Sequence, residues 1–166
     1  MTEIASPVSL MDEVKAQARV LVPVLKALRA ELGAEKANRL VGEALRDWSK
    51  SLYHRIGAAE PGGPKQKFDA IWTDLRPRIG DSVERDLLRD DAEARDYNIT
   101  RCRYAEFFKE LGEPDLGTIL LCEIDFHIAD VGGPDIEFTR TQTIMKGAPY
   151  CDFRYRMKTD GRVESD

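Results

Sequence analysis

The chain has 166 residues, of which 42% are hydrophobic and 33% charged, and 30 acidic against 25 basic side chains give a formal net charge of −5. This composition is typical of one water-soluble domain, and the mixed charges disfavour nucleic acid as a partner, because phosphate binding requires a concentrated basic surface. No apolar run approaches the roughly 18 residues of a membrane span, and the N-terminus lacks a signal- or transit-peptide pattern. We therefore expect a cytoplasmic protein with no nucleic-acid or membrane partner.

The first third of the chain is predicted to be helical. Hydrophobic residues recur every three or four positions over residues 11–32 and again over residues 40–56, and each stripe ends at a glycine. Pro23 is expected to kink or divide the first helix. The two helices should pair antiparallel as a helical hairpin over residues 8–57.

The middle of the chain is predicted to hold a loop, two shorter helices, a strand and a third helix. Residues 58–65 contain two prolines and two glycines, which favour a loop. Residues 68–80 and 81–96 are expected to form the shorter, more solvated helices. A strand at residues 97–102 and a short helix at residues 104–112 should follow.

The last third is predicted to hold one longer helix and a β-hairpin. The helix should cover residues 114–134, with Asp115 as its N-cap and two glycines and a proline at its end. Strands at residues 135–146 and 150–157 should form the hairpin.

Together these elements predict a single α+β domain over residues 1–166. Its N-terminal helical pair packs with a small antiparallel β-sheet that includes the C-terminal β-hairpin. Residues 95–157 form the half that carries the candidate motifs, and the polar residues 158–166 are expected to fray.

The predicted helix at residues 114–134 places one acid away from solvent. On a helical wheel Glu123, His127 and Asp130 share the solvent arc, which makes His127 an expected surface histidine. Cys122 and Asp125 lie nearly opposite, one turn apart. A carboxylate that faces the interior needs a cation, hydrogen-bond donors or a proton, so Asp125 is either a structural ion-pair partner or a site residue.

The predicted hairpin places polar side chains on its core face. Strand alternation puts Arg140 and Gln142 on the side of Phe138, and Cys151 on the side of Tyr155. With a loop at about residues 146–149, Arg140 should pair with Tyr155. Asp152 falls on the opposite face, where a cross-strand or ion-pair role is as plausible as a site role.

These two surfaces are expected to meet in the interior. Arg140 would then neutralise Asp125 or receive a substrate carboxylate through its two-pronged guanidinium. It would also lower the pKa of a nearby thiol and favour the nucleophilic thiolate. The alternative is a buried Arg–Asp pair that only holds helix to sheet.

Three segments resemble the L-2-amino-thiazoline-4-carboxylic acid hydrolase family. They are ITRCRYAEFFKELGEPDLG, CEIDF and, above all, RTQTIMKGAPYCDFRYR, and the resemblance covers residues 99–156. A fainter likeness, in the turn before the final strand, is to small-molecule-binding domains of the vinyl-reductase type. The resemblance implies hydrolytic opening of a small heterocyclic ring, such as the conversion of 2-aminothiazoline-4-carboxylate to N-carbamoyl-cysteine, by a hydrolase that acts on C–N bonds of cyclic amidines.

The resemblance also suggests roles for the candidate residues. Cys122 or Cys151 would be the nucleophile, Asp125 the acid/base and Arg140 the carboxylate anchor. Substrate-orienting roles fall to Thr141, Gln142, Thr143 and Asp152. We expect a small-molecule substrate and no cofactor, and the amphipathic N-terminal helices are compatible with a homo-oligomer.

Two rival functions remain open at this point. Cys102, Cys122, Cys151 and Asp125 would supply zinc ligands if folding gathered them, although no CxxC or HxxxH spacing is present and no metal site is expected. A non-catalytic sensor or carrier would bind a carboxylated ligand through Arg140 in an apolar pocket.

Overall fold

The structure is a computed structural model that describes residues 8–158. Its helices are α1 (Leu10–Leu32), α2 (Ala34–Ala58), α3 (Pro64–Ile79), α4 (Arg103–Glu110) and α5 (Pro114–Leu120). Three short 3-10 helices follow or interrupt them: η1 (Cys122–His127), η2 (Ala129–Asp135) and η3 (Ile144–Lys146). The strands are β1 (Val83–Asp90), β2 (Ala94–Cys102), β3 (Ile136–Thr139) and β4 (Cys151–Met157). The chain is thus an α+β protein, as the sequence predicts.

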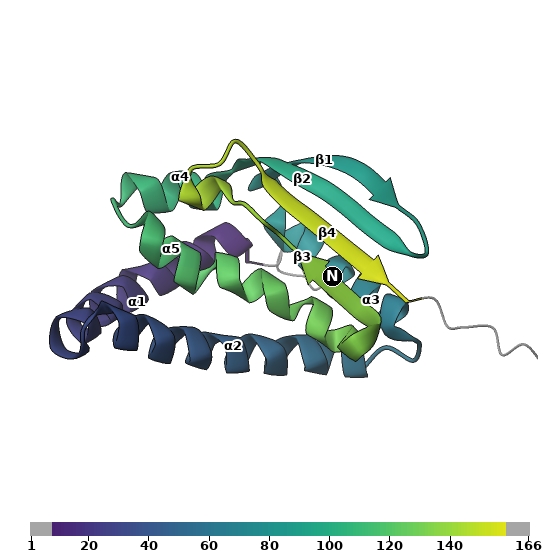
Figure 1. The fold of residues 1–166 in the computed structure, drawn as a ribbon, viewed down its shortest axis with the longest axis horizontal. Coiled ribbons are helices and arrows are strands. Elements are labelled where there is room, and N and C mark those ends of the chain that lie inside the picture. Colours follow the sequence, from purple (N-terminus) through teal and green to yellow (C-terminus); the bar gives the residue numbers. More distant parts are fainter. Residues whose placement is uncertain (1–7, 159–166) are drawn as a thin grey trace, which may run out of the picture.

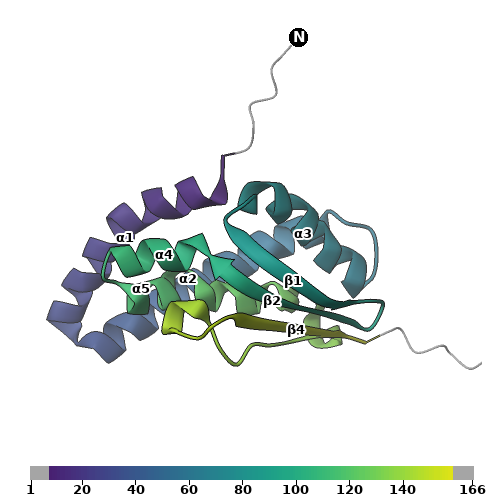
Figure 2. The same cartoon turned by 90° about the horizontal axis from the view of Figure 1, so that it is seen from above.

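The elements lie in layers (Figure 1). Helices α1 and α2 form one side of the molecule, the sheet forms the other, and the run from α5 through η2 lies between α2 and the sheet. Helix α3 lies alongside β1 in the view from above (Figure 2) and packs on the sheet through Phe68, whose ring centroid is 4.8 Å from that of Tyr155. No described helix is long and apolar enough to cross a membrane.

The first two helices form where the hydrophobic stripes predict them. Ser9 caps α1 by accepting the backbone N–H of Asp12 at 3.1 Å, and Gly33, with φ +83°, ends the helix and starts α2. Of the two effects expected of Pro23, a kink or a division, α1 shows no division and runs unbroken from Leu10 to Leu32. Its side chain is exposed, so the carbonyl that loses its partner lies on the solvent side of the helix.

Residues 81–96 form most of a β-hairpin, so the prediction of a helix there was wrong. Seven of the eight residues of β1 are exposed, because β1 is an edge strand in the sheet order β1-β2-β4-β3. An edge strand with this exposure lacks the apolar–polar alternation that marks strands in a sequence. The turn is fixed by Asp91, whose carboxylate accepts the backbone N–H groups of Glu93 and Ala94, each at 2.9 Å.

The predicted long helix at residues 114–134 is also wrong in its length. Helix α5 ends at Leu120, and Leu121 leaves helical geometry with φ −133° and ψ −60° before the 3-10 helix η1 begins. Asp115 lies in the first turn of α5, and Glu113 is the N-cap residue. Gly117 packs so closely on α4 that a Cβ atom there would lie 2.6 Å from Phe108 Cγ.

The C-terminal hairpin keeps the predicted faces but not the predicted length or register. Strand β3 ends at Thr139, and Phe138 rather than Arg140 pairs with Tyr155. The register therefore differs by two residues, and an even shift leaves the side chains of β3 on their predicted faces. Beyond Thr139 the alternation fails, since Thr143 and Met145, predicted on the face away from the core, are buried.

Beyond Thr139 the backbone binds side chains in place of a strand ladder. The N–H groups of Thr141 and Gln142 donate to the carboxylate of Asp152 at 3.0 and 2.9 Å, and that of Ile144 donates to Cys151 Sγ at 3.2 Å. Because these acceptors are side chains, the segment leaves the sheet and brings Arg140 toward the interior. Of the tail expected to fray, residues 159–166 lie outside the described part of the chain.

Candidate functional site

A cavity of about 340 Å³ lies between α3, η1 and the strands β1, β2 and β4. Most of its walls are apolar or aromatic, including Trp72, Tyr97 and Phe153. Its lining also contains the groups that the sequence marks as chemically capable, which are Cys102, Cys122, Asp125, Arg140 and Cys151. The cavity has the size of a small-molecule site.

Arg140 and Asp125 form an ion pair at the cavity wall. The Arg140 side chain is only 5% exposed, and its Nη1 donates to Asp125 Oδ2 at 2.6 Å. Its Nη2 donates to the backbone carbonyl of Cys122 at 2.9 Å. The guanidinium also lies over the rings of Phe126 and Phe153, at 4.9 and 5.3 Å from their centroids. Both terminal nitrogens of the Arg140 guanidinium are therefore hydrogen-bonded within the protein.

Asp125 titrates in an unusual range. Its side chain is 34% exposed and lines the cavity. Burial raises the pKa of Asp125 to about 6, although the charge and hydrogen bond of Arg140 act in the opposite direction. The carboxyl can thus hold or release a proton near neutral pH, which is the property of a general acid–base group.

The geometry of η1 explains why Cys122 and Asp125 share a face. A 3-10 helix has about three residues per turn, so positions i and i+3 eclipse one another. The sequence predicts an α-helix here, but positions i and i+3 are neighbours in both helix types, so Cys122 and Asp125 share a face in either.

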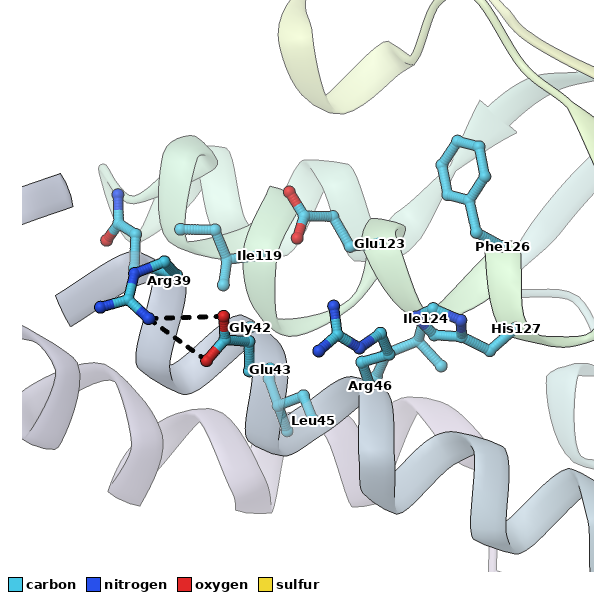
Figure 3. Close-up of a pocket in the computed structure, with 11 residues that line it drawn as sticks. Arg39, Gly42, Glu43, Leu45, Arg46, Ile119, Glu123, Ile124, Phe126 and His127 are labelled. Atoms are coloured by element: carbon cyan, nitrogen blue, oxygen red, sulfur yellow. Dashed lines mark hydrogen bonds and ion pairs between the residues drawn. The ribbon is translucent and has the colours of Figure 1, made fainter. Parts of the chain in front are cut away.

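The other side of η1 faces a second hollow, of about 460 Å³, between η1 and α2 (Figure 3). Glu123, Phe126 and His127 line it from η1, opposite the ion pair Arg39–Glu43 on α2, which measures 3.4 Å. His127 is not the exposed surface histidine that the wheel predicts, since its side chain is 14% exposed and its Nδ1 lies 3.1 Å from Asp130.

The three thiols of the cavity are not activated. Burial raises the pKa of Cys122 and of Cys151, and in both cases the opposing charge of Arg140 is the weaker influence. Burial likewise raises the pKa of Cys102 to about 11. Arg140 therefore acts on Cys122 and Cys151 in the expected direction, but burial decides the outcome, and the thiols are protonated at neutral pH.

The remaining candidates lie outside the cavity lining. Thr141 donates its hydroxyl to Asp152 at 2.7 Å, and Thr143 is buried and accepts the N–H of Lys146 at 3.2 Å. Gln142 has a buried side-chain nitrogen with no hydrogen-bond partner among residues 8–158. These contacts place the segment that carries Arg140, without direct contact with the cavity.

Asp152 has the opposite acid–base character to Asp125. Burial acts to raise its pKa, but the hydrogen bonds from Thr141 and the backbone outweigh it, so the pKa of Asp152 is held below its usual value. Its side chain lies on the face of β4 away from Cys151, as alternation predicts.

Part of the cavity wall is not predicted from the sequence. Arg76, Arg85 and Trp72 all line it. Arg85 was overlooked because its strand was predicted as a solvated helix, and nothing in the pattern of α3 marks Arg76 or Trp72. Within the described residues, no three His, Cys, Asp or Glu side chains converge closely enough to hold a metal ion, although the cysteines share one cavity.

The fold and this cavity define a small α+β domain that is built around a ligand-sized internal site. The family model for L-2-amino-thiazoline-4-carboxylic acid hydrolase matches residues 13–155, and the chain belongs to this family. A search of curated proteins gives no match.

One solved structure shows the same fold. It is the phenol-responsive sensory domain of the transcription activator PoxR, in complex with phenol, with a TM-score of 0.51 and 12% sequence identity. The similarity covers 82% of this chain and 72% of the sensory domain. At this identity the likeness concerns the fold alone.

Proposed function

We propose that the protein hydrolyses a small heterocyclic ring in the cavity, with Asp125 as the acid–base group. The observation that carries this proposal is the position of Asp125, which faces the cavity beside Arg140 with a pKa of about 6. Membership of the hydrolase family supports the reaction class.

The family's named substrate, 2-aminothiazoline-4-carboxylate, fixes the atom balance of the reaction. A water molecule adds to the ring carbon that bears the amino group, and Asp125 accepts a proton from it. The adduct then breaks its carbon–sulfur bond. Of the two water protons, one ends on the ring nitrogen and the other on the leaving sulfur, which yields N-carbamoyl-cysteine.

This balance corrects one expectation from the sequence. N-carbamoyl-cysteine keeps the bond between the ring nitrogen and the attacked carbon, so the bond that breaks is carbon–sulfur and not carbon–nitrogen. A leaving thiol needs less help from an acid than an amine does, because its pKa is lower. The main demand on Asp125 is therefore to act as the base toward water.

The other site residues take supporting roles in this proposal. Arg140 holds the Asp125 carboxylate in place and keeps its pKa from rising further. A cysteine nucleophile is not required, since the thiols of Cys122 and Cys151 are protonated at neutral pH.

A second candidate is a sensor or carrier that binds a small molecule without changing it. Two observations favour it: the largely apolar and aromatic cavity wall, and the fold shared with the phenol-responsive domain of PoxR. Protonated thiols fit this function equally well.

Incubation with 2-aminothiazoline-4-carboxylate separates the two candidates. Hydrolysis releases N-carbamoyl-cysteine, which mass spectrometry detects, together with a free thiol for colorimetric titration. We expect turnover by the wild type and by the double variant Cys122→Ala/Cys151→Ala, and a large loss of turnover in Asp125→Asn. Saturable binding without product would support the sensor function. Stoichiometric zinc in the purified protein would instead support a zinc-dependent hydrolase and contradict the role of Asp125 as the acid–base group.

A further inference from the structure

The mouth of the cavity carries two arginines that the proposed reaction has not used. Arg76 lies in the last turn of α3 and Arg85 lies on β1, and both are exposed side chains that also line the cavity. Their exposure places them at the rim, whereas Arg140 is buried deeper in the wall.

Charge at the cavity is opposite to that of the whole chain. Three arginines and one aspartate line it, a formal excess of two positive charges when the thiols are protonated. The chain as a whole carries −5. A cationic hollow in an acidic protein favours an anionic ligand over a neutral one of equal shape.

Arg140 is a poor candidate for binding that anion, because both of its terminal nitrogens already donate hydrogen bonds to Asp125 and to the Cys122 carbonyl. Arg76 and Arg85, in contrast, form no ion pair within residues 8–158. Their guanidinium groups are free to bind a carboxylate in the two-pronged manner that arginine allows.

Arg85 is also held in position at the rim. Its guanidinium carbon lies 5.3 Å from the ring centroid of Tyr97, a buried residue of the cavity wall. The β1–β2 register shifts between Glu84 and Arg85, and such a bulge re-aims the side chain next to it. Two independent features thus direct an exposed edge-strand arginine to the cavity.

We propose that Arg76 and Arg85 form the carboxylate subsite of the ligand, with the ring directed inward toward Asp125. This inference rests on the proposed function in taking the cavity as the site. It transfers the role of carboxylate anchor from Arg140 to the rim, so the rim arginines determine specificity and Arg140 positions Asp125.

Direct binding tests the subsite independently of turnover. Trp72 lines the cavity, so its fluorescence reports binding once the exposed Trp48 is replaced in a Trp48→Phe background. The probes are 2-aminothiazoline-4-carboxylate and 2-amino-2-thiazoline, which is the same ring without the carboxylate. Benzoate and benzamide form a second pair that differs chiefly in charge.

We expect Arg76→Gln/Arg85→Gln to raise the Kd of each acid at least tenfold, as the loss of a charge-assisted hydrogen bond does, and to raise that of its carboxylate-free partner less than about twofold. Arg89→Gln is the matched control, since Arg89 is an exposed β1 arginine outside the cavity lining that pairs with Asp91 at 2.6 Å. It should leave all four constants unchanged.

The outcomes separate the subsite from the hydrolase. Equal weakening of the acids and their carboxylate-free partners, or no weakening of the acids, overturns the subsite even if turnover is observed. A wild type that binds neither acid also overturns it. Charge-selective binding that the double variant abolishes supports the subsite, even if no N-carbamoyl-cysteine forms.

Discussion

Asp125 and Asp152 are the same residue type in two motif-like segments, yet the structure gives them opposite properties. Asp125 faces the cavity with one guanidinium partner, and burial raises its pKa to about 6. Asp152 lies on the outer face of β4 and accepts hydrogen bonds from the backbone N–H groups of Thr141 and Gln142 and from the Thr141 hydroxyl, which hold its pKa low.

The difference shows how a carboxylate acquires its role. Several donors stabilise the charged form of Asp152 and lower its pKa, so that its carboxylate fixes the backbone. Asp125 lies in a buried wall with a single cationic partner, so its protonated and ionised forms have similar free energies near neutral pH. Burial together with the number of donors around each carboxylate, more than its motif, therefore separates the structural aspartate from the chemical one.

The largest effect should come from Asp125→Asn, which removes the acid–base group and keeps the shape. Turnover of 2-aminothiazoline-4-carboxylate should fall by about 10²–10⁴-fold, with an unchanged circular dichroism spectrum. Asp152→Asn is the matched comparison and should lower turnover less than about tenfold, because Asp152 acts only through the backbone. Equal losses in the two variants would contradict the separation of roles.

Arg140→Gln should have the next largest effect. It leaves Asp125 without its cation, and breaking a buried pair costs about 3 kcal/mol of unfolding free energy. Because Arg140 lowers the pKa of Asp125, its loss should also move the acid limb of the pH–rate profile toward higher pH. Urea denaturation and the pH–rate profile measure the two effects.

A double variant controls for the lost packing of the arginine. Arg140→Gln/Asp125→Asn should recover part of the lost stability, because no unpaired carboxylate remains. A double variant no more stable than Arg140→Gln alone would show that the ion pair is not the cause.

Asp152→Asn should destabilise the protein by about 1–2 kcal/mol, since an amide accepts fewer of the three hydrogen bonds and these lie partly at the surface. Thr141→Val removes only the hydroxyl bond and should cost about half as much. Thermal or urea unfolding provides the measurement. A loss from Thr141→Val as large as that from Asp152→Asn would mean that the backbone contacts contribute nothing.

The smallest effect is the dependence of stability on pH. The folded-state pKa of Asp125 lies above its ordinary value of 3.8, so the folded protein binds more protons than the unfolded chain between about pH 4 and 6. Its contribution to stability is therefore present below pH 4 and lost as pH rises to 6. Allowing for its one-third exposure, the change is about 1 kcal/mol.

Asp152 contributes with the opposite sign. Its depressed pKa supplies stability above the unfolded pKa, and this is lost as pH falls through the folded value. Urea midpoints measured from pH 3 to pH 7 in Asp125→Asn and Asp152→Asn should each lack one of the two slopes. Identical pH profiles for the two variants would contradict the opposite shifts.

The sequence predicts what depends on periodicity. Strand alternation puts Arg140 on the core face even though the strand ends at Thr139, because the register differs by an even number of residues. The i,i+3 spacing likewise brings Cys122 and Asp125 to one wall in a 3-10 helix as in an α-helix.

The sequence does not predict what tertiary contacts decide. The break at Leu121 accompanies two such contacts, the close packing of Gly117 on Phe108 and the use of the Cys122 carbonyl by Arg140. Neither contact leaves a trace in local composition. Strand β1 is not predicted because an exposed edge strand shows no apolar–polar alternation. Arg85 is therefore not predicted as a residue of the cavity wall.

The segment from Arg140 to Ile144 is held against β4 by hydrogen bonds from its backbone N–H groups to the side chains of Cys151 and Asp152. Any residue type can form backbone hydrogen bonds between strands, but these contacts require the particular side chains of Cys151 and Asp152. Point substitutions there can reshape one wall of the cavity while the pairs between β2 and β4 stay intact. We therefore expect substitutions at Cys151 and Asp152 to change the ligand preference of the cavity more than the pairing of the sheet.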